Sequence, residues 1–418
     1  MLDPGYLRAL HDARFLAPGG YFLGSSIWRE AGLRSVDLLI SCYVDLLSEF
    51  SEPEVTEHPF LMRESLYRAV FATYGNVVTV DLSERGSQRH VLRPDNMPAS
   101  VDTLIADGRP GPLVAVGGLL RRFNGQVAPL FRERYIWPAV QVTHMVERGR
   151  GEELLDRHQR ALESLLTALA LPVLSIRTDA LSDYGHPCYL TVTCLPDGRP
   201  TVLSTSYLMS ERYRSALGVE QDVLDIGFTG KVLAVVALHH RDHRGLALPS
   251  AVAPTQIGLI HEEHRRLEHH RMRDSLTASG LRTTLRTVHR DDRRRRSTAE
   301  RGAHRLGAPL VVHDLGASEH TLLTQRLPIR RSTIRSAPGV KTFEEALHEH
   351  DERLLSHAVR RFKRSLGRGE LLRPLCNTCV VERKPPVFGW VTPVEERACA
   401  HCGRSGRMAF ISDQGRFY

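Results

Sequence analysis

Four cysteines in the last fifth of the chain constrain its fold most strongly, because they form two closely spaced pairs. Two residues separate Cys376 from Cys379 and Cys399 from Cys402, and 19 residues lie between the pairs. A two-residue spacer lets one tight turn direct two sulfur atoms at one point, and this arrangement is typical of zinc sites. Gly403 follows the second pair, where a tight turn favours glycine. Four thiolates complete the tetrahedral shell of Zn²⁺, so the sequence predicts a structural zinc ion.

Two alternatives to coordination by four cysteines stay open from the sequence. The pairs can be thiols or disulfides without a metal, and His401 can replace one cysteine as a ligand. The other three cysteines, Cys42, Cys188 and Cys194, lie in apolar periodic segments, where we expect buried small side chains.

The composition is that of a folded chain of two or three domains. The chain has 418 residues, of which 42% are hydrophobic and 25% charged, so each domain can bury a core and disorder throughout is excluded. There is no run of about 20 apolar residues, and the N-terminal sequence lacks the apolar segment of a secretory signal. We therefore expect no membrane association and a cytoplasmic location.

The basic residues are unusual in kind and in distribution. The chain has 52 arginines, only four lysines and a net charge of +8. An arginine excess reflects either GC-rich coding or phosphate recognition, and composition does not decide between them. Residues 261–306 contain 13 arginines and seven acidic residues, so six of the eight net charges lie there. Within this block, Arg293 to Arg296 form either a solvated loop or a contact for the phosphates of a nucleic acid.

Hydrophobic periodicity predicts a mixture of helices and strands. Helices are predicted over residues 29–50, 151–170, 261–279 and 341–367. Strands are predicted over residues 76–82, 88–92, 132–145, 172–177, 189–195, 201–205, 231–238, 256–260, 281–288 and 310–312. We expect Pro138 to break one of these strands and the apolar run 231–238 to be a buried strand. The alternation of strands and helices after residue 254 indicates a small α/β unit.

Several motifs resemble prolyl-tRNA synthetases of class II, and they occur in the same order along nearly the whole chain. Residues 240–249 (HRDHRGLALP) and 253–256 (APTQ) resemble the end of motif 3 and the following linker. The hairpin turn at 195–198, the segment 91–94 (VLRP) and Pro59 also match. The cysteine pairs and the terminal Tyr418 are similar to the archaeal and eukaryotic branch of the family, which has a C-terminal zinc-binding domain.

The resemblance implies an α+β fold in three parts. Residues 1–250 would form a class II synthetase-like catalytic domain, an antiparallel sheet with flanking helices. Residues 251–340 would form an anticodon-binding-like α/β domain, and residues 341–418 a zinc-binding domain. The resemblance also implies a homodimer formed through motif 1. The family's reaction joins proline to ATP, with Mg²⁺, as prolyl-adenylate and then transfers the acyl group to tRNA.

The cations that the family directs at ATP are partly retained. Arg122 falls at the position of the arginine for the α-phosphate, and Arg132 and Arg134 match arginines at the end of the motif 2 loop. Lys231 falls at the position of an arginine over the phosphates, so the charge is kept without the planar fork, unless it only opens a buried strand. Asn124 replaces a glutamate that accepts a hydrogen bond from adenine, and an amide oxygen can still accept it. The resemblance makes these five the expected ATP-binding residues, and Arg122, Arg134 and Lys231 the expected catalytic ones.

The residues that would face the amino acid are largely replaced. Met97 stands at the position of the glutamate that holds the proline nitrogen, and Tyr207 at the position of a histidine. Asp95 can supply a carboxylate from a displaced position, or it can be only a turn residue after Pro94. The resemblance therefore makes Asp95, Met97 and Tyr207 the expected lining of the substrate pocket.

A histidine cluster offers a second candidate metal site. His239, His240 and His243 lie at the end of the run 231–238. Successive side chains alternate between the two faces of a strand, so His239 and His240 would point apart. We therefore expect scattered imidazoles at a strand end.

Two functions follow from this combination of retained and replaced residues. The first is an enzyme that activates an amino or imino acid other than ordinary proline as an acyl-adenylate and passes it to tRNA, a small amine or a carrier. The second is a catalytically silent paralogue that binds tRNA or a protein partner. An ordinary prolyl-tRNA synthetase is disfavoured, because Met97 lacks the charge of the glutamate it replaces.

Overall fold

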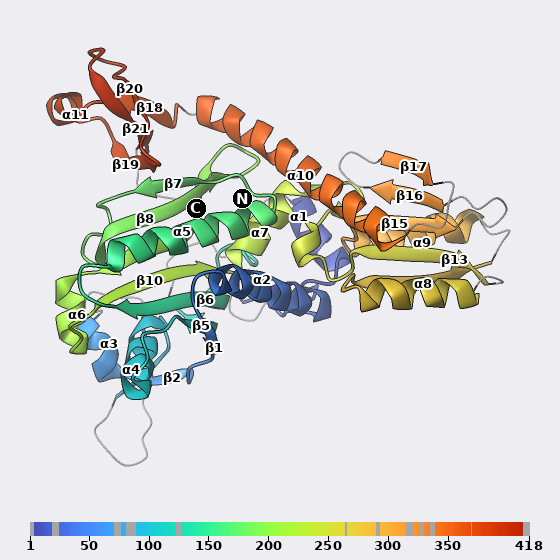
Figure 1. Ribbon diagram of the computed structural model, residues 1–418, viewed down its shortest axis with the longest axis horizontal. Helices are drawn as coiled ribbons and strands as arrows, with labels where there is room; N and C mark the ends of the chain where they lie inside the picture. The colour runs from blue at the N-terminus through green and yellow to red at the C-terminus, as the bar shows by residue number, and fades with distance from the viewer. Residues whose placement is uncertain are drawn as a thin grey trace.

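A single long sheet organises most of the molecule (Figure 1), and a smaller α/β domain lies beside it. The computed structural model describes residues 4–18, 25–70, 77–80, 89–122, 128–263, 266–289, 293–314, 321–325, 330–334, 339–368 and 370–412.

The large sheet is antiparallel except at one edge, where β1 runs parallel to β5. Its strands, in spatial order, are β1 (Glu54–Thr56), β5 (Leu113–Leu120), β6 (Tyr135–Val146), β10 (Asp222–Thr229), β9 (Pro200–Met209), β8 (Gly185–Cys194), β7 (Leu174–Arg177), β19 (Val387–Thr392), β21 (Ser405–Ile411) and β18 (Leu372–Leu375). The predicted hairpin is present as β8 and β9, with its turn at residues 195–199.

Four helices bury apolar side chains against this sheet in one core. They are α1 (Pro4–Asp12), α2 (Glu30–Ser48), α5 (Gly151–Ala168) and α7 (Lys231–His239). In α2 the buried residues Val36, Leu39, Tyr43 and Leu47 recur at intervals of three or four, which places them on one side of a helix. Figure 1 shows α2 and α5 lying across the same face of the sheet. The helices predicted over 29–50 and 151–170 are therefore confirmed.

A second, smaller core lies at one end of the sheet. It is formed by α3 (Glu64–Val70), α4 (Met97–Asp107) and α6 (Glu211–Leu217) together with a three-stranded sheet of β2 (Leu61–Arg63), β4 (His90–Leu92) and β3 (Val78–Val80). The turn expected at residues 84–87 lies outside the described residues. Between the large sheet and the α/β domain, the chain forms the short hairpin β11 (Arg241–Asp242) and β12 (Gly245–Leu246) and then η1 (Ser250–Val252).

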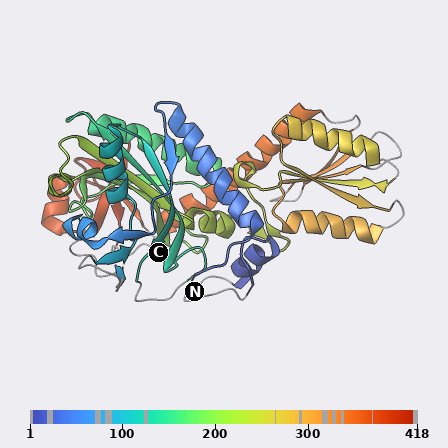
Figure 2. The same ribbon diagram turned by 90° about the horizontal axis from the view of Figure 1, so that it is seen from below.

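The predicted α/β unit is a five-stranded sheet with helices on both faces (Figure 2). Its strands, in spatial order, are β14 (Thr283–Val288), β13 (Ile257–Glu262), β15 (Leu310–Asp314), β16 (Thr321–Gln325) and β17 (Arg330–Ile334). Leu259 packs on the side of α8 (Arg266–Ala278), whereas Ile260 packs on the side of α9 (Arg293–Arg305), as the alternation along a strand requires.

The long helix α10 (Val340–Arg368) joins the α/β domain to the cysteine module. Its first turns, with Phe343 and Leu347, belong to the core of the α/β domain. The cysteine module consists of β18, α11 (Asn377–Arg383), β19, β20 (Glu396–Ala398) and β21. Because β19 pairs with β7, the module continues the large sheet, although the chain reaches it last. Among the described residues, no helix combines the length and apolarity needed to cross a bilayer.

The strand predicted over residues 231–238 is wrong, because this segment forms helix α7. Every residue from Val232 to His239 is buried. A segment enclosed on all sides has no polar face, so its pattern is uniformly apolar in a helix as well as in a strand. The surrounding helices and the sheet decided between them.

Two further expectations need correction. Pro138 does not break its strand: it lies inside β6, next to an irregularity in the pairing with β5, and its carbonyl oxygen accepts the N–H of Gly230 at 2.8 Å. Arg293 to Arg296 are not a loop, because they form the first turn of α9. Cys188 and Cys194 are buried as predicted, whereas Cys42 is half-buried.

Candidate active site

A cavity of about 260 Å³ opens on the large sheet where β5, β6, β9 and β10 lie side by side. Its lining is Asp95, Leu119, Arg121, Ala139, Val140, Gln141, Leu181, Tyr184, Thr205, Tyr207, Asp225, Gly227, Phe228 and Thr229. The volume is smaller than that of pockets for drug-sized ligands, which begin at about 300 Å³. An amino acid is a ligand of suitable size.

Asp95 lies in this cavity and is also a turn residue, so both interpretations of it describe the same side chain. Its Oδ1 accepts the backbone N–H of Met97 at 3.0 Å, as a turn residue would. The same oxygen accepts Nε2 of Gln141 at 2.9 Å, and its Oδ2 pairs with the guanidinium of Arg121 at 3.1 Å. The charge of Asp95 is therefore balanced within the protein.

A second carboxylate, Asp225, lies at the bottom of the cavity, and the sequence interpretation missed it. Its side chain is 3% exposed. Gln141 donates to both of its oxygens at 2.9 Å, and Tyr207 donates to it as well. Burial, followed by the negative charge of Asp95, raises the pKa of Asp225 to about 7, although these hydrogen bonds oppose the rise.

A signal for Asp225 was present in the sequence. It is the only charged residue inside the otherwise apolar run 223–228 (VLDIGF). A lone acid in a buried strand is unusual enough to mark a candidate site.

Gln141 holds the two carboxylates apart. Its Nε2 group donates to both acids, and its Oε1 accepts the backbone N–H of Asn96 at 3.0 Å. The amide is thereby fixed in one orientation, with its donors toward the acids. Arg121 forms its ion pair with Asp95. Its attraction for Asp225 is the smallest of the named causes that act on the pKa of that acid, and burial outweighs it.

Met97 and Tyr207 lie in different environments. Tyr207 is part of the cavity lining, on strand β9 opposite Asp225. Met97 is fully buried in the second core at the start of α4 and is absent from the lining. The position that has lost its charge has thus become a core position.

Lys231 lies close to the cavity but outside its lining. It is the first residue of α7, and its backbone N–H donates to Oγ1 of Thr229, a lining residue, at 3.3 Å. Its ammonium nitrogen is 4.8 Å from the centre of the Phe131 ring. Burial, followed by repulsion from Arg132, lowers the pKa of Lys231 to about 7. A phosphate placed between these two cations would remove that repulsion.

The three arginines expected to contact ATP are exposed at one end of the β5–β6 pair. Arg122 follows Arg121, whose backbone N–H donates to the carbonyl oxygen of Arg134 at 3.0 Å. Arg132 is held by a bridge to Ala128. Asn124 lies outside the described residues. The fold therefore gathers Arg122, Arg132 and Arg134 just beyond the ends of the two strands, β5 and β6, that also line the cavity.

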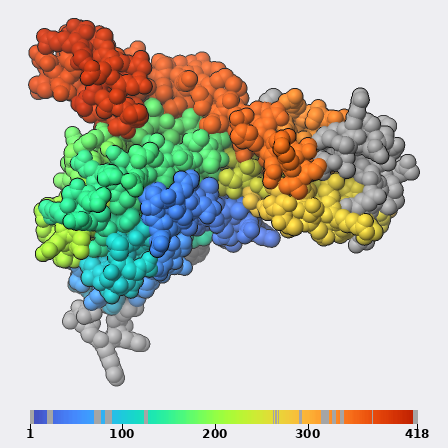
Figure 3. Space-filling model, in the orientation of Figure 1, coloured from blue at the N-terminus to red at the C-terminus, as the bar shows by residue number. Residues whose placement is uncertain are grey.

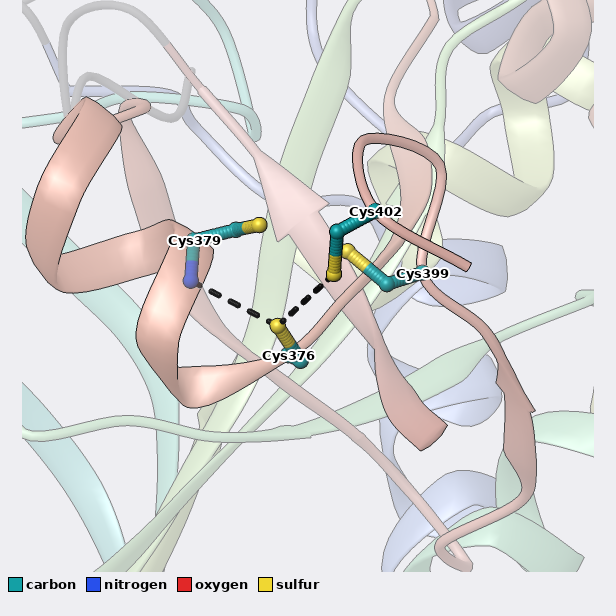
Figure 4. Close-up of side chains that lie close together, drawn as sticks. All are labelled: Cys376, Cys379, Cys399 and Cys402. Atoms are coloured by element: carbon teal, nitrogen blue, oxygen red, sulfur yellow. Dashed lines mark hydrogen bonds between the residues drawn. The ribbon is translucent and has the colours of Figure 1, made fainter. Parts of the chain in front are cut away.

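The four predicted zinc ligands converge in the cysteine module (Figure 4). Their sulfur atoms all lie within 4.8 Å of one another, and Cys376 Sγ is 3.6 Å from Cys402 Sγ. Zn–S bonds of about 2.3 Å in a tetrahedron give S···S edges of about 3.8 Å, so the spacing fits zinc. It does not fit a disulfide, in which the sulfur atoms are about 2.05 Å apart.

Backbone groups support this cluster. The N–H of Cys379 donates to Cys376 Sγ at 3.4 Å, and Gly403 closes the second turn with a φ of 74°. This φ lies in the left-handed region that favours glycine, as the sequence predicted. Among the described residues, the four cysteines are the one group of three or more potential metal ligands that comes together.

The histidine cluster is not such a site. His239 Nε2 hydrogen-bonds the carbonyl oxygen of Cys194 at 2.9 Å, and His240 Nε2 that of Ala170 at 3.1 Å. Both imidazoles are buried at the end of α7, whereas His243 is exposed. They are at the end of a helix and not, as expected, of a strand.

No family model matches the chain, but individual proteins do. The proline–tRNA ligase of Halorubrum lacusprofundi is 26% identical over 240 residues, which are 51% of this chain and 48% of that protein. The proline–tRNA ligase of Roseiflexus sp. is 22% identical over 278 residues, 61% of this chain and 55% of that protein. The chain thus matches about half the length of these relatives.

Solved structures of prolyl-tRNA synthetases have the same fold. The enzyme of Cryptosporidium parvum in complex with L-proline and AMP superposes with a TM-score of 0.81 at 16% identity, covering 99% of this chain and 94% of that one. The enzyme of Giardia lamblia in complex with prolyl-adenylate superposes with a TM-score of 0.79 at 14% identity, covering 99% and 97%. The predicted class II fold is confirmed, and the chain is similar to prolyl-tRNA synthetases in sequence over about half its length and in fold over nearly all of it.

Proposed function

We propose that the protein is an adenylate-forming enzyme of the aminoacyl-tRNA ligase type, whose substrate is a small amino acid other than ordinary proline. ATP enters as its Mg²⁺ complex, and tRNA is the acceptor that the fold favours over a small amine or a carrier. The observation that carries the proposal is the buried carboxylate of Asp225 at the bottom of a cavity of amino-acid size.

Asp225 provides the charge that recognition of an amino acid requires. A buried carboxylate whose hydrogen-bond donors, Gln141 and Tyr207, are neutral is costly when ionised, and a substrate ammonium group would compensate it more closely than the charge of Arg121 does. Met97 cannot supply this charge, and Asp95 already pairs with Arg121. Recognition of the amine would therefore come from β10 in this chain, a different position from the glutamate expected by resemblance. This displacement favours a substrate other than proline.

The proposed reaction gives the basic residues near the cavity a role at the α-phosphate of ATP. A carboxylate oxygen of the amino acid forms a bond to the α-phosphorus of ATP, the bond to the β-phosphate oxygen breaks, and pyrophosphate leaves. Negative charge accumulates on the α-phosphate oxygens, so positive groups fixed in advance lower the barrier. In our proposal Arg122 and Arg134 contact this phosphate from the β5–β6 end and Lys231 contacts the phosphates from the start of α7. Binding of phosphate would also restore the charge of Lys231.

Exchange of labelled pyrophosphate into ATP tests the proposal. A panel of amino and imino acids is assayed with the full chain, and we expect exchange with at least one small amino acid and weak or no exchange with proline. Asp225→Asn should raise the KM for the amino acid more than it lowers kcat. Asp107→Asn, an exposed acid at the end of α4, is the matched control. Absence of exchange with every acid would contradict an enzymatic role and leave the silent tRNA- or protein-binding paralogue.

We further propose that Cys376, Cys379, Cys399 and Cys402 hold a structural Zn²⁺ ion. Four sulfur ligands leave no open position for a substrate, so the ion would fix the module and take no part in the reaction. Because β19 pairs with β7, its effect would reach the edge of the large sheet.

A homodimer in the cytoplasm is the remaining part of the proposal. Exposed apolar side chains gather around β1 and β2, where Val55 is 51%, Phe60 37% and Leu61 36% exposed. Large apolar side chains that are exposed close together in the sequence support an interface at this edge. Sedimentation at micromolar concentration tests this part, and a monomeric mass would contradict it.

A further inference from the structure

A basic cleft lies outside the cavity described above, between the C-terminal half of α10 and the turn of the β8–β9 hairpin. Its volume is about 490 Å³. Its lining is Pro196, Asp197, Gly198, Arg199, Pro200, Arg361, Arg364, Ser365, Arg368 and Leu371. We call it the arginine cleft. Figure 3 shows this part of α10 at the surface, between the body of the catalytic domain and the cysteine module.

The direction of the arginines follows from how α10 is anchored. Leu354, Ala358 and Phe362 are buried, and with Leu366 they recur every four residues along one side of the helix. Arg364 and Arg368 are exposed on a neighbouring side, and Arg361 is half-buried. Helix α10 is therefore fixed by its apolar side and presents a row of guanidinium groups to the cleft.

These arginines are not used to balance acids. Among the described residues, no acidic side chain forms an ion pair with Arg361, Arg364 or Arg368, and the one acid in the lining, Asp197, pairs with Arg199 at 2.6 Å. Burial, followed by repulsion from Arg364 and Arg241, lowers the pKa of Arg361. Burial, followed by repulsion from Arg361, Arg360 and Arg364, also lowers the pKa of His357. Positive charge is thus concentrated here without compensation.

Stabilisation of the helix end explains only part of the row. Cations in the last turn of a helix interact favourably with its dipole, which accounts for Arg368 and less for Arg364. The effect is confined to the last turn, so it does not explain the half-buried Arg361, two turns earlier. Stabilisation of the helix dipole alone gives no reason to half-bury Arg361 beside other arginines.

The length of the row indicates the kind of ligand. Seven residues separate Arg361 from Arg368, which is about 10 Å along a helix. This length exceeds one phosphate group and fits successive phosphates of one strand, which carries one phosphate per about 3.4 Å of duplex axis and winds around that axis. Guanidinium groups bind phosphate oxygens in pairs, so the row suits a chain of phosphates.

We propose that the arginine cleft binds the phosphate backbone of RNA. The choice of RNA over other polyanions rests on the proposed function, because the tRNA acceptor would come with it. The cleft itself does not depend on adenylate formation.

Binding of unfractionated tRNA at several KCl concentrations, measured by fluorescence anisotropy with the full chain, tests the proposal. The test variant is R361Q/R364Q/R368Q. The control R294Q/R301Q/R305Q removes the same charge from exposed arginines of α9, in the basic block singled out in the sequence. We expect the test variant to bind at least tenfold more weakly at low salt. Its slope of log K against log salt should be smaller by about two to three, because each phosphate contact contributes about 0.7 to 0.9. The control should change the affinity less than threefold.

Four results would overturn the proposal: no salt-dependent binding by the unmodified chain, equal weakening in both variants, weakening only in the α9 variant, or tighter binding of duplex DNA than of tRNA. If the triple variant does not fold, R364Q/R368Q keeps the buried arginine and provides the same comparison. Pyrophosphate exchange is measured on the same samples. Pyrophosphate exchange without tRNA binding would refute RNA binding by the arginine cleft and leave the proposed reaction standing. Binding of tRNA through the cleft without exchange would refute the proposed reaction and leave RNA binding standing.

Discussion

Replacing Asp225 by asparagine should stabilise the protein much more at pH 8 than at pH 5. The carboxyl group is buried, and its pKa is about 7 in the folded chain against 3.8 for an unperturbed aspartate. Between these two pH values the unfolded chain has released the proton and the folded chain retains it. Stability therefore falls as the pH rises through this window, and the loss is complete above pH 7.

The structure gives the size of this effect. A difference of about 3 pH units corresponds to at most about 4 kcal/mol of unfolding free energy at pH 8. Asparagine is neutral and of the same shape, but it offers one acceptor oxygen where aspartate offers two to Gln141 and Tyr207. Loss of one hydrogen bond costs about 1 kcal/mol. We therefore expect a net gain of up to about 3 kcal/mol at pH 8. At pH 5 the unfolded aspartate has already ionised while the folded one has not, which costs about 1.6 kcal/mol, so the net gain there falls below about 1 kcal/mol.

Thermal unfolding of the full chain, followed by tryptophan fluorescence at pH 5 and pH 8, measures this difference. A gain of 3 kcal/mol corresponds to roughly 6–10 °C for a domain of about 250 residues. Asp107→Asn, which alters an exposed acid of the same domain, should shift Tm by less than 1 °C at either pH, since surface substitutions change stability by about 0.5 kcal/mol at most. Equal shifts of Asp225→Asn at the two pH values would refute the view that burial raises the pKa of this carboxyl group.

Three further predictions concern the proposed ligands. The affinity for the amino acid substrate should rise about tenfold from pH 6 to pH 8, as Asp225 ionises. The same titration with Asp225→Asn should show no such rise. Lys231→Ala should raise the KM for ATP about 100-fold, since it removes a charge-assisted contact worth about 2–3 kcal/mol, and Lys231→Arg should restore most of the affinity for ATP. The control is Lys341→Ala, on the exposed start of α10. Equal effects of the two alanine variants would exclude a phosphate contact by Lys231. Elemental analysis should find one zinc ion per chain and none after Cys399→Ser, which should also lower Tm; full zinc content in that variant would show that this cysteine is not a ligand.

The sequence predicted that the four cysteines come together because their spacing involves only neighbouring residues. Two residues between paired cysteines determine which sulfurs can meet in one turn, whatever the rest of the fold does. The amphipathic helices α2 and α5 were predictable for a similar reason: each has one buried and one exposed side, and this difference leaves a period in the sequence. The motif order along the chain extended these local results to the class II fold.

Segments buried on every side were not predictable in this way. The run 231–238 has no exposed side in the structure, so its apolar pattern fitted a strand and a helix equally. The full lining of the cavity was not predictable for another reason. Resemblance directed attention to Met97, which is a core residue, while the acid that enters the cavity is Asp225, on a strand more than 100 residues later.

By itself, the sequence determined the elements with a clear period, the cysteine module and the family that the chain resembles, because these depend on neighbouring residues and on motif order. Only the tertiary structure decided which charges meet. Antiparallel pairing places β10 between β6 and β9, and this order brings Asp225 next to Gln141 and Tyr207. The packing of α10 on the sheet likewise exposes its arginines beside the β8–β9 turn. Electrostatic interactions depend on distance in space, and the distance along the chain does not specify it.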